Sequence, residues 1–275
     1  MNQIKLEQQL RDFLEEDIGD GDITSQALPQ GLKKTAYIFA KEDGVFVGAS
    51  ILKVGYSIIN RHINVRLMKA DGQFVEKGET VAEVTGAVDQ LLLGERVFLN
   101  LIQRLSGIAT LTKKSIEALN DPTIRVCDTR KTTPGLRMLE KYAVRCGGGF
   151  NHRRGLDQAV LLKENHLAAY GGIRQAVSRV KETLGHMTKI EVEITNKQEL
   201  IDVIEAEVDV IMFDNYSSQQ VKEQQPLVPS NIVTEVSGGI SLKTIREFAG
   251  CGVNYISLGF LTHSYKAIDY SFLLK

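Results

Sequence analysis

Charged residues or glycines follow six successive short apolar runs in the second half of the sequence. They are Asp128-Thr-Arg130-Lys131, Lys163-Glu164-Asn165-His166, Glu193, Asp214-Asn215, Ser237-Gly238-Gly239 and Gly259. In barrels of parallel strands all carboxyl ends point into one mouth, where active sites gather. A charge after one strand is usually only a solvated loop residue, but six in succession make that alternative weak. The pattern therefore predicts an active site.

Residues 125–154 carry a local surplus of positive charge, although the formal net charge of the chain is only -1. The basic residues are Arg125, Arg130, Lys131, Arg137, Lys141, Arg145, Arg153 and Arg154, against only Asp128 and Glu140. Such a surplus indicates a multiply anionic small molecule or nucleic acid. Because these residues surround a glycine turn at 147–149 and do not follow one helix face, we expect a small anion.

Two acids and a glycine turn narrow the ligand further. Glu193 and Asp214 form a pair of hard oxygen ligands, which suits Mg²⁺ that also binds substrate phosphates. Residues 237–239 precede a predicted helix, so their N–H groups can receive a phosphate, and Gly259 offers a similar setting. This combination fits a phosphorylated sugar bearing a pyrophosphate. A Schiff-base aldolase stays open as an alternative because Lys163 ends a strand, although one phosphate would not need so many arginines.

Alternation of short β-branched runs with helical stretches predicts a parallel sheet built from βα units. The predicted strands are 123–127, 159–162, 189–192, 208–213, 232–236 and 254–257, and the clearest helices are 173–184, 197–206 and 242–249. Six strands are too few for an eight-unit barrel, so we expect an incomplete or open barrel.

The first half of the chain has a different pattern. A helix is predicted at 6–17, followed by strands at 36–40, 44–48, 64–68 and 80–84. Residues 91–105 are apolar nearly all round, which predicts a helix buried in the protein or at a subunit contact. We expect Ser106-Gly107 to interrupt this helix before a second one that ends near Leu119.

Bulk features exclude several classes of protein. No run of about 18 apolar residues spans a membrane, and the N-terminus lacks the apolar core of a signal peptide. Cys127, Cys146 and Cys251 are far apart and form no Cys-x-x-Cys pair, which favours small buried hydrophobic residues over metal ligands. We therefore expect a cytoplasmic protein that binds neither membrane nor nucleic acid.

Longer motifs extend the pattern beyond single residues. They are Gln103-Arg-Leu-Ser-Gly-Ile-Ala-Thr110, Asp128-Thr-Arg-Lys-Thr-Thr-Pro-Gly-Leu-Arg137, Glu140-Lys-Tyr-Ala-Val-Arg-Cys-Gly-Gly-Gly149, Asn151-His-Arg153, Leu162-Lys-Glu-Asn-His166, Glu191-Val-Glu193, Phe213-Asp-Asn215 and Ser237-Gly-Gly-Ile240. Together they resemble the quinolinate phosphoribosyltransferase family, also called nicotinate-nucleotide pyrophosphorylase (carboxylating). The similarity covers essentially the whole chain, and the block at 129–135 is highly specific.

The resemblance implies an α/β fold of the type II phosphoribosyltransferases. An N-terminal α/β sandwich domain (1–111) would precede an open six-stranded parallel α/β barrel (112–275), with residues 266–275 packing on the first domain. It also implies a homodimer, or a higher oligomer, in which the sandwich of one subunit closes the barrel mouth of the other. The implied reaction transfers phosphoribosyl from 5-phosphoribosyl 1-pyrophosphate to quinolinate, giving nicotinate mononucleotide, pyrophosphate and CO₂.

Matching motif positions imply a role for each site residue. Arg104 would reach into the partner's site. The carboxylates and the pyrophosphate would be held by Thr129, Arg130, Lys131, His152, Arg153 and Lys163. The ribose and Mg²⁺ would face Glu193 and Asp214, and the 5′-phosphate would bind Ser237, Gly238, Gly239 and Gly259. The expected catalytic residues are Lys131, Lys163, Glu193 and Asp214.

Departures from the family pattern are small, and none of them changes a charged site residue. Val236 replaces a common alanine, and Leu162 and Leu167 replace frequent isoleucines. A related group associated with molybdenum transport shares much of the framework and stays open as an alternative, as does a non-catalytic polyanion-binding protein.

Overall fold

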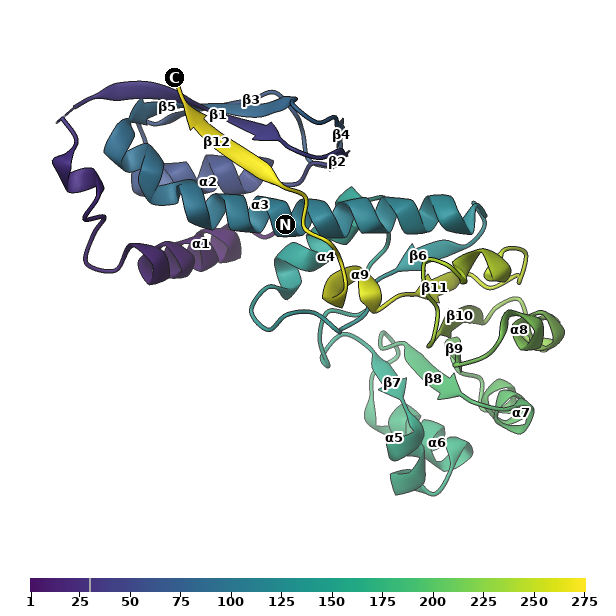
Figure 1. The fold of residues 1–275 in the computed structure, drawn as a ribbon. Coiled ribbons are helices and arrows are strands. Elements are labelled where there is room, and N and C mark those ends of the chain that lie inside the picture. The colour runs from purple at the N-terminus through teal and green to yellow at the C-terminus, as the bar shows by residue number, and fades with distance from the viewer. Residues whose placement is uncertain (30) are drawn as a thin grey trace. The chain divides into compact units, whose positions relative to one another are not determined.

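The computed structural model describes residues 1–29 and 31–275, which form two compact units (Figure 1). The first unit contains residues 1–113, 138–148 and 264–275, and the second contains residues 114–137 and 149–263. Sequence analysis placed one boundary after residue 111. By their internal contacts, the two units change at residues 113–114, 137–138, 148–149 and 263–264.

The first unit is built on a four-stranded antiparallel sheet with the strand order β12-β1-β5-β3. Its strands are β1 (Lys33–Ala40), β3 (Asn64–Leu67), β5 (Thr80–Ala87) and β12 (Tyr270–Leu274). Buried and less buried residues alternate along β1, so one face of the sheet carries the core. The predicted strand at 44–48 is reduced to β2 (Gly44–Val45), which pairs with β4 (Phe74–Val75).

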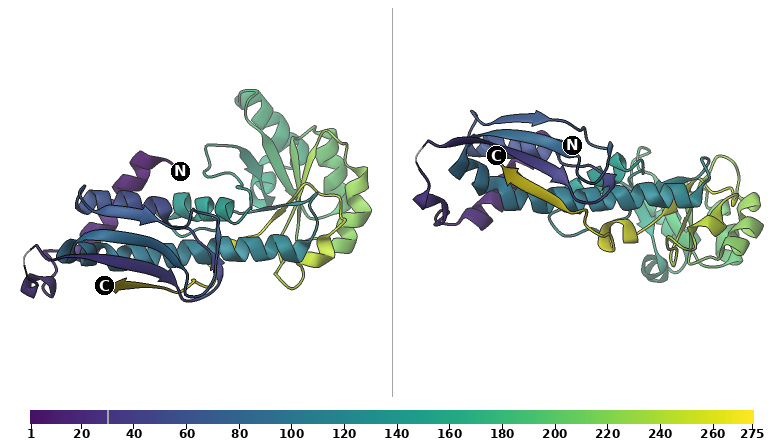
Figure 2. Two further views of the ribbon diagram at one scale, coloured as in Figure 1. Left: turned by 90° about the horizontal axis from the view of Figure 1, so that it is seen from above. Right: turned by 45° about the horizontal axis from the view of Figure 1, so that its top comes forward.

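Helices cover one face of this sheet (Figures 1 and 2). They are α1 (Gln3–Ile18), α2 (Ala49–Ile59) and the first part of α3 (Val88–Leu119). α1 packs on α2. The ring of Tyr56 on α2 meets the ring of Phe98 on α3 at a centroid distance of 4.9 Å. The Tyr56 hydroxyl also donates to the Leu91 carbonyl, so its one polar group is satisfied in the core.

α3 is one unbroken helix, and the predicted interruption at Ser106-Gly107 is wrong. Ser106 Oγ accepts a hydrogen bond from the main-chain N–H of Val47 at 3.0 Å. A Cβ on Gly107 would lie only 2.3 Å from the carbonyl oxygen of Lys266. Both small residues therefore permit close packing against other segments of the first unit and do not end the helix.

α4 (Arg137–Cys146) leads into the glycine turn that sequence analysis placed at the centre of the basic segment. A Cβ on Gly147 would lie 2.4 Å from the carbonyl oxygen of Ala109 on α3. Close approach of two helices, and not an anion, accounts for this glycine.

The second unit is a curved sheet of six parallel strands in the order β6-β11-β10-β9-β8-β7. They are β6 (Arg125–Cys127), β7 (Val160–Leu162), β8 (Ile190–Ile194), β9 (Val210–Asp214), β10 (Val233–Ser237) and β11 (Tyr255–Ser257). Each lies within two residues of its predicted bounds. Among the described residues β6 and β7 do not pair, so the barrel is open. The predicted fold class is confirmed.

Helices α6, α7 and α8 lie outside this sheet (Figure 1). The helices of the second unit are α5 (Glu164–Tyr170), α6 (Ile173–Thr183), α7 (Lys197–Glu205), α8 (Ser218–Gln224) and α9 (Phe260–His263). The helix predicted at 242–249 is wrong, because only a 3₁₀ turn at Ile245–Phe248 forms. Thr244 Oγ1 accepts the N–H of Ser241, and such local hydroxyl bonds compete with helix formation. No helix in the described ranges is long and apolar enough to cross a membrane.

Candidate active site

The carboxyl ends of the six parallel strands surround a cavity of about 540 Å³. Predicted site residues that line it are Thr129, Arg130, Lys131, His152, Arg153, Lys163, Glu193, Asp214, Ser237, Gly238 and Gly239. Residues to which sequence analysis assigned no role also line it: Leu161, Met212, Asn215, Glu235 and Ser257. Strands of one parallel sheet end at one edge, which brings residues far apart in the sequence together.

Lys163 and Glu193 form an ion pair at this edge. Lys163 is half exposed, whereas Glu193 is 15% exposed. A Schiff-base lysine needs an uncharged amine, usually in a desolvated pocket or beside another cation. Lys163 is half exposed and paired with a carboxylate, so it lacks that setting, which argues against the aldolase alternative.

Asn215 directly follows β9 and fixes the carboxylate of Asp214. Its side-chain amide donates to Asp214 Oδ2 at 2.8 Å, and its main-chain N–H donates to the Ser237 carbonyl at 2.8 Å. Its φ of 58° is unusual for a residue other than glycine. The residue thus links the ends of β9 and β10. In the sequence, the position of Asn215 directly after the strand-end residue Asp214 could have indicated that it belongs to the site.

The turn at Gly238 and Gly239 has the backbone of an anion cradle. Both residues have positive φ, 88° and 65°, and their main-chain N–H groups have no acceptor in the part of the chain that the structure describes. A Cβ on Gly238 would lie 2.3 Å from Asn215 Oδ1. Since only a 3₁₀ turn follows, the predicted helix N-terminus does not contribute. An anion would be held by the N–H groups of the turn itself.

Cations line the same cavity. The Arg153 guanidinium donates from Nη1 to the Ala159 carbonyl at 2.7 Å, and burial followed by the charge of Arg130 lowers the pKa of Arg153. Gly259 does not line the cavity. A Cβ there would lie 2.8 Å from Lys131 Cδ, so this glycine makes room for the lysine side chain. Thr262 Oγ1 donates to the Lys131 carbonyl and holds its main chain.

The rest of the basic segment does not form one surface. Arg125, at the start of β6, lies over the ring of Phe150 at 4.9 Å. Arg137 donates to the Arg154 carbonyl, and Lys141 is buried. This dispersal removes the continuous basic face that a polyanion-binding protein would need.

Arg104 lies in the first unit, where the structure assigns it partners within the chain. Its Nε donates to Glu140 Oε1 at 2.9 Å, and its guanidinium carbon is 5.0 Å from the ring centroid of Tyr265. Glu140 is fully buried. The carboxylate and the aromatic ring together hold the arginine in one orientation.

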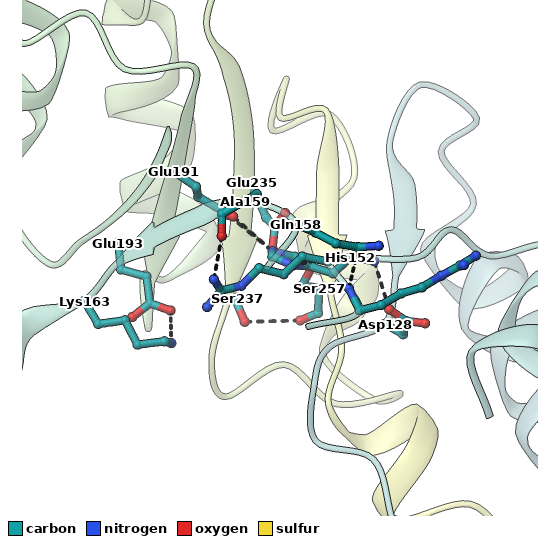
Figure 3. A network of polar contacts seen from close by, with 12 residues as sticks. Asp128, His152, Gln158, Ala159, Lys163, Glu191, Glu193, Glu235, Ser237 and Ser257 are labelled. Carbon is teal, nitrogen blue, oxygen red and sulfur yellow. Dashed lines mark hydrogen bonds and ion pairs between the residues drawn. The ribbon is translucent and has the colours of Figure 1, made fainter. Parts of the chain in front are cut away.

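A buried cluster that sequence analysis missed adjoins His152 (Figure 3). His152 Nε2 is 3.1 Å from Glu191 Oε2 and 3.6 Å from Glu235 Oε1. Both glutamates are buried, with at most 5% of each residue exposed. Burial, followed by the charge of Glu191, raises the pKa of Glu235 to about 7. The sequence does contain a sign of this cluster. Glu191 and Glu235 each lie two positions before a strand-end site residue, and residues two apart in a strand share one face.

Asp128 anchors the segment that carries His152. Phe150 forms a parallel bridge with Cys127 on β6. The fully buried Asp128 then accepts from the His152 main-chain N–H at 2.9 Å and from Asn151 Nδ2 at 2.6 Å. The segment therefore enters the site along a fixed path.

Comparison with known proteins decides the family. Models of the C-terminal and N-terminal domains of quinolinate phosphoribosyl transferase match residues 108–273 and 22–106. The chain belongs to the quinolinate phosphoribosyl transferase family. The resemblance inferred from the motifs is confirmed.

Relatives of this family member match it over nearly its full length. The probable nicotinate-nucleotide pyrophosphorylase (carboxylating) of Bacillus subtilis is 52% identical over 271 residues, covering 98% of this chain and 94% of the relative. The chloroplastic nicotinate-nucleotide pyrophosphorylase (carboxylating) of Arabidopsis thaliana is 38% identical, covering 94% and 79%.

Solved structures of the quinolinate phosphoribosyl transferase family agree with the fold. NadC from Streptococcus pyogenes superimposes with a TM-score of 0.96 at 37% identity, covering 100% of this chain and 98% of the other. The nicotinate-nucleotide pyrophosphorylase of Francisella tularensis gives 0.95 at 37% identity, with the same coverage.

Proposed function

We propose that this chain is a nicotinate-nucleotide pyrophosphorylase (carboxylating), an enzyme of NAD biosynthesis. It transfers phosphoribosyl from 5-phosphoribosyl 1-pyrophosphate to quinolinate, with loss of CO₂. The observation that carries this function is the cavity at the six strand ends, where cations, two acids and a glycine cradle gather in a chain 52% identical to a protein named for that reaction.

The cations of the cavity suit both anionic substrates. Arg130, Lys131, Arg153 and Lys163 offer charge and hydrogen bonds to the two carboxylates of quinolinate and to the pyrophosphate. Gly238 and Gly239 point main-chain N–H groups at the 5′-phosphate. Binding at both ends places the pyridine nitrogen against C1 of the ribose, so positioning is the main catalytic contribution.

The bond changes need no covalent intermediate with the protein. The pyridine nitrogen forms a bond to C1 while the bond from C1 to pyrophosphate breaks, through a cation-like ribose. Lys131 and Lys163 stabilise the departing negative charge, and Glu193 and Asp214 stabilise the sugar. The adjacent carboxylate then leaves as CO₂, its bonding electrons remain on the ring carbon next to the cationic nitrogen, and a proton adds there.

The donor set of the cavity fits Mg²⁺. Glu193 uses Oε1 for Lys163, and Asp214 uses Oδ2 for Asn215, which leaves one oxygen of each carboxylate for a metal ion. Mg²⁺ is commonly held by one or two carboxylates together with substrate phosphates and water. When bound, it would neutralise charge on the pyrophosphate. We therefore propose Mg²⁺ as cofactor, with Glu193 and Asp214 as its ligands.

We further propose that the protein is a homodimer with shared sites. Arg104 is oriented by Glu140 and Tyr265 in the first unit, whereas the cavity belongs to the second. A second copy that supplies Arg104 to this cavity would use that orientation. A cytoplasmic location is also proposed, because Cys146 and Cys251 form no disulfide among the described residues, as is usual in a reducing compartment.

The test is direct. Purified protein with quinolinate, 5-phosphoribosyl 1-pyrophosphate and Mg²⁺ should release nicotinate mononucleotide and CO₂ in equal amounts. Nicotinate in place of quinolinate is the matched control, because it lacks the carboxylate that leaves, and should release no CO₂. Absence of product above background with quinolinate would refute the proposed function.

A further inference from the structure

A second, smaller cavity lies inside the barrel next to the active-site cavity. It measures about 220 Å³ and is lined near the amino ends of the strands by Lys189, Val210, Val233 and Tyr255. His152, Arg153 and Glu235 line both cavities, and Glu191 lines only the smaller one. These four residues therefore form a layer between the two cavities. We call this layer the floor of the active site.

Both ring nitrogens of His152 are used within this floor. Nδ1 accepts a hydrogen bond from the main-chain N–H of Arg153 at 2.8 Å. A nitrogen that accepts carries no proton, so the proton of the neutral ring lies on Nε2. Nε2 is the atom that faces Glu191 at 3.1 Å and Glu235 at 3.6 Å. The ring thus bridges the Arg153 main chain and the buried carboxylate of Glu191, while Glu235 Oε1 lies nearby without a hydrogen-bond partner among the described residues.

The same geometry argues against a metal ion in the floor. Ligand atoms of His152, Glu191 and Glu235 lie within 4.8 Å of one another, which is close enough for a shared ion. A ligating Nε2 must, however, be free of its proton, with the proton on Nδ1. Here Nδ1 is occupied as an acceptor. Hydrogen bonding is therefore the chemistry that the cluster supports.

The floor also acts on the Arg153 side chain. Burial and the charge of Arg130 lower the pKa of Arg153. The charges of Glu191 and Glu193 act in the opposite direction and favour the charged guanidinium. The Arg153 main chain is thus held by the His152 ring, and its guanidinium is held by the Ala159 carbonyl beside two carboxylates that favour its charge.

We propose that Glu191 is a positioning residue, which holds the His152 ring and through it places Arg153 to receive a substrate carboxylate. This inference rests on the proposed function. It predicts a selective defect, because Arg153 would be misplaced while the glycine cradle for the phosphate stays intact.

Steady-state kinetics of Glu191→Ala and Glu191→Gln test the proposal. Glu191→Ala should raise KM for quinolinate about tenfold or more, with KM for 5-phosphoribosyl 1-pyrophosphate within about twofold of wild type. Glu191→Gln should stay within about threefold for both substrates, because its amide oxygen still accepts from Nε2. Glu205→Gln, exposed on α7, is the matched control for loss of one carboxylate and should match wild type.

Two kinetic results would overturn the proposal. One is an equal rise in both KM values for Glu191→Ala. The other is a Glu191→Gln variant as defective as Glu191→Ala. If the wild type itself makes no product, the proposed function fails and kinetics do not decide the positioning role.

A spectroscopic measurement decides it independently of turnover. Ring-nitrogen NMR of histidine-labelled protein, with His152 assigned among the five histidines by its loss in His152→Ala, reports which nitrogen is protonated. The proposal requires a neutral ring with the proton on Nε2, and Glu191→Gln should retain that form. A ring protonated on Nδ1 alone would refute the proposal even in an active enzyme.

Discussion

The side-chain amide of Asn215 donates to Asp214 Oδ2 at 2.8 Å while its main chain holds a left-handed φ of 58°. That conformation costs a residue other than glycine about 1 kcal/mol. Strain of this kind persists where the surroundings over-determine it, commonly at functional sites. Here the hydrogen bond from the Asn215 N–H to the Ser237 carbonyl fixes the conformation. The Asp214 carboxylate and the turn at Gly238 and Gly239 are therefore held in a fixed relation to each other.

Asn215→Asp should therefore impair metal and substrate binding. It replaces the amide donor with a carboxylate that repels Asp214. We expect the Mg²⁺ concentration for half-maximal activity and KM for 5-phosphoribosyl 1-pyrophosphate to rise about tenfold. Asn215→Gly is the control, because it keeps the left-handed backbone, adds no charge and should have a smaller effect. Titrations of Asn215→Asp that overlay those of wild type would contradict the role.

Gly238→Ala should lose phosphate affinity. Its Cβ would meet Asn215 Oδ1 at 2.3 Å and the Asn215 main-chain nitrogen at 2.8 Å, so the cradle must shift. Gly250→Ala is the matched control, because Gly250 also has positive φ but no atom within 4 Å of its Cβ. Both variants should lose about 1 kcal/mol through backbone strain, measured by denaturant unfolding. Only Gly238→Ala should raise KM for the phosphorylated substrate, and equal kinetics would exclude a cradle.

Glu235→Gln should change how stability depends on pH. The raised pKa, about 7 against 4.5 for an ordinary glutamate, means that the fold disfavours the carboxylate. Wild-type stability therefore falls as pH rises between these values, and the full penalty is present above pH 7. The amide lacks this penalty.

The Tm of Glu235→Gln relative to wild type should consequently be higher at pH 8 than at pH 5, by roughly 3 °C or more. Thermal unfolding of both proteins across this range is the measurement. Glu205→Gln should show a difference that does not vary with pH. A pH-independent difference for Glu235→Gln would mean that the carboxylate is not strained by burial.

Mixing two inactive variants tests the shared site. Arg104→Ala changes the first unit and Lys131→Met changes the cavity, so each alone should be nearly inactive. After subunit exchange, a mixed dimer would contain one site with both native residues. The mixture should recover about one quarter of wild-type activity. Activity that stays at the level of either variant would show that Arg104 does not serve a partner.

The sequence predicted the parallel strands and most of the cavity because a strand end is marked locally. An apolar run stops, and a charge such as Asp214 or a glycine such as Gly238 follows. Glu191 and Glu235 escaped because they lie within strands, where a charge is identified as inward-facing only once its partner His152 is known. The meaning of Gly107 depends on Lys266, more than a hundred residues away, so a packing glycine was taken for a helix break. Hydroxyl bonds within 241–244 were overlooked, which led to a helix where only a turn forms.

β12 pairs with β1, so the sheet of the first unit needs residues 270–274 to complete its edge. During synthesis those residues follow every strand of the parallel sheet. Until they arrive, β1 presents an open edge that invites pairing with other chains. The order of translation therefore completes the edge of the first unit's sheet only after every strand of the parallel sheet has been made, so β1 stays open to other chains for most of synthesis.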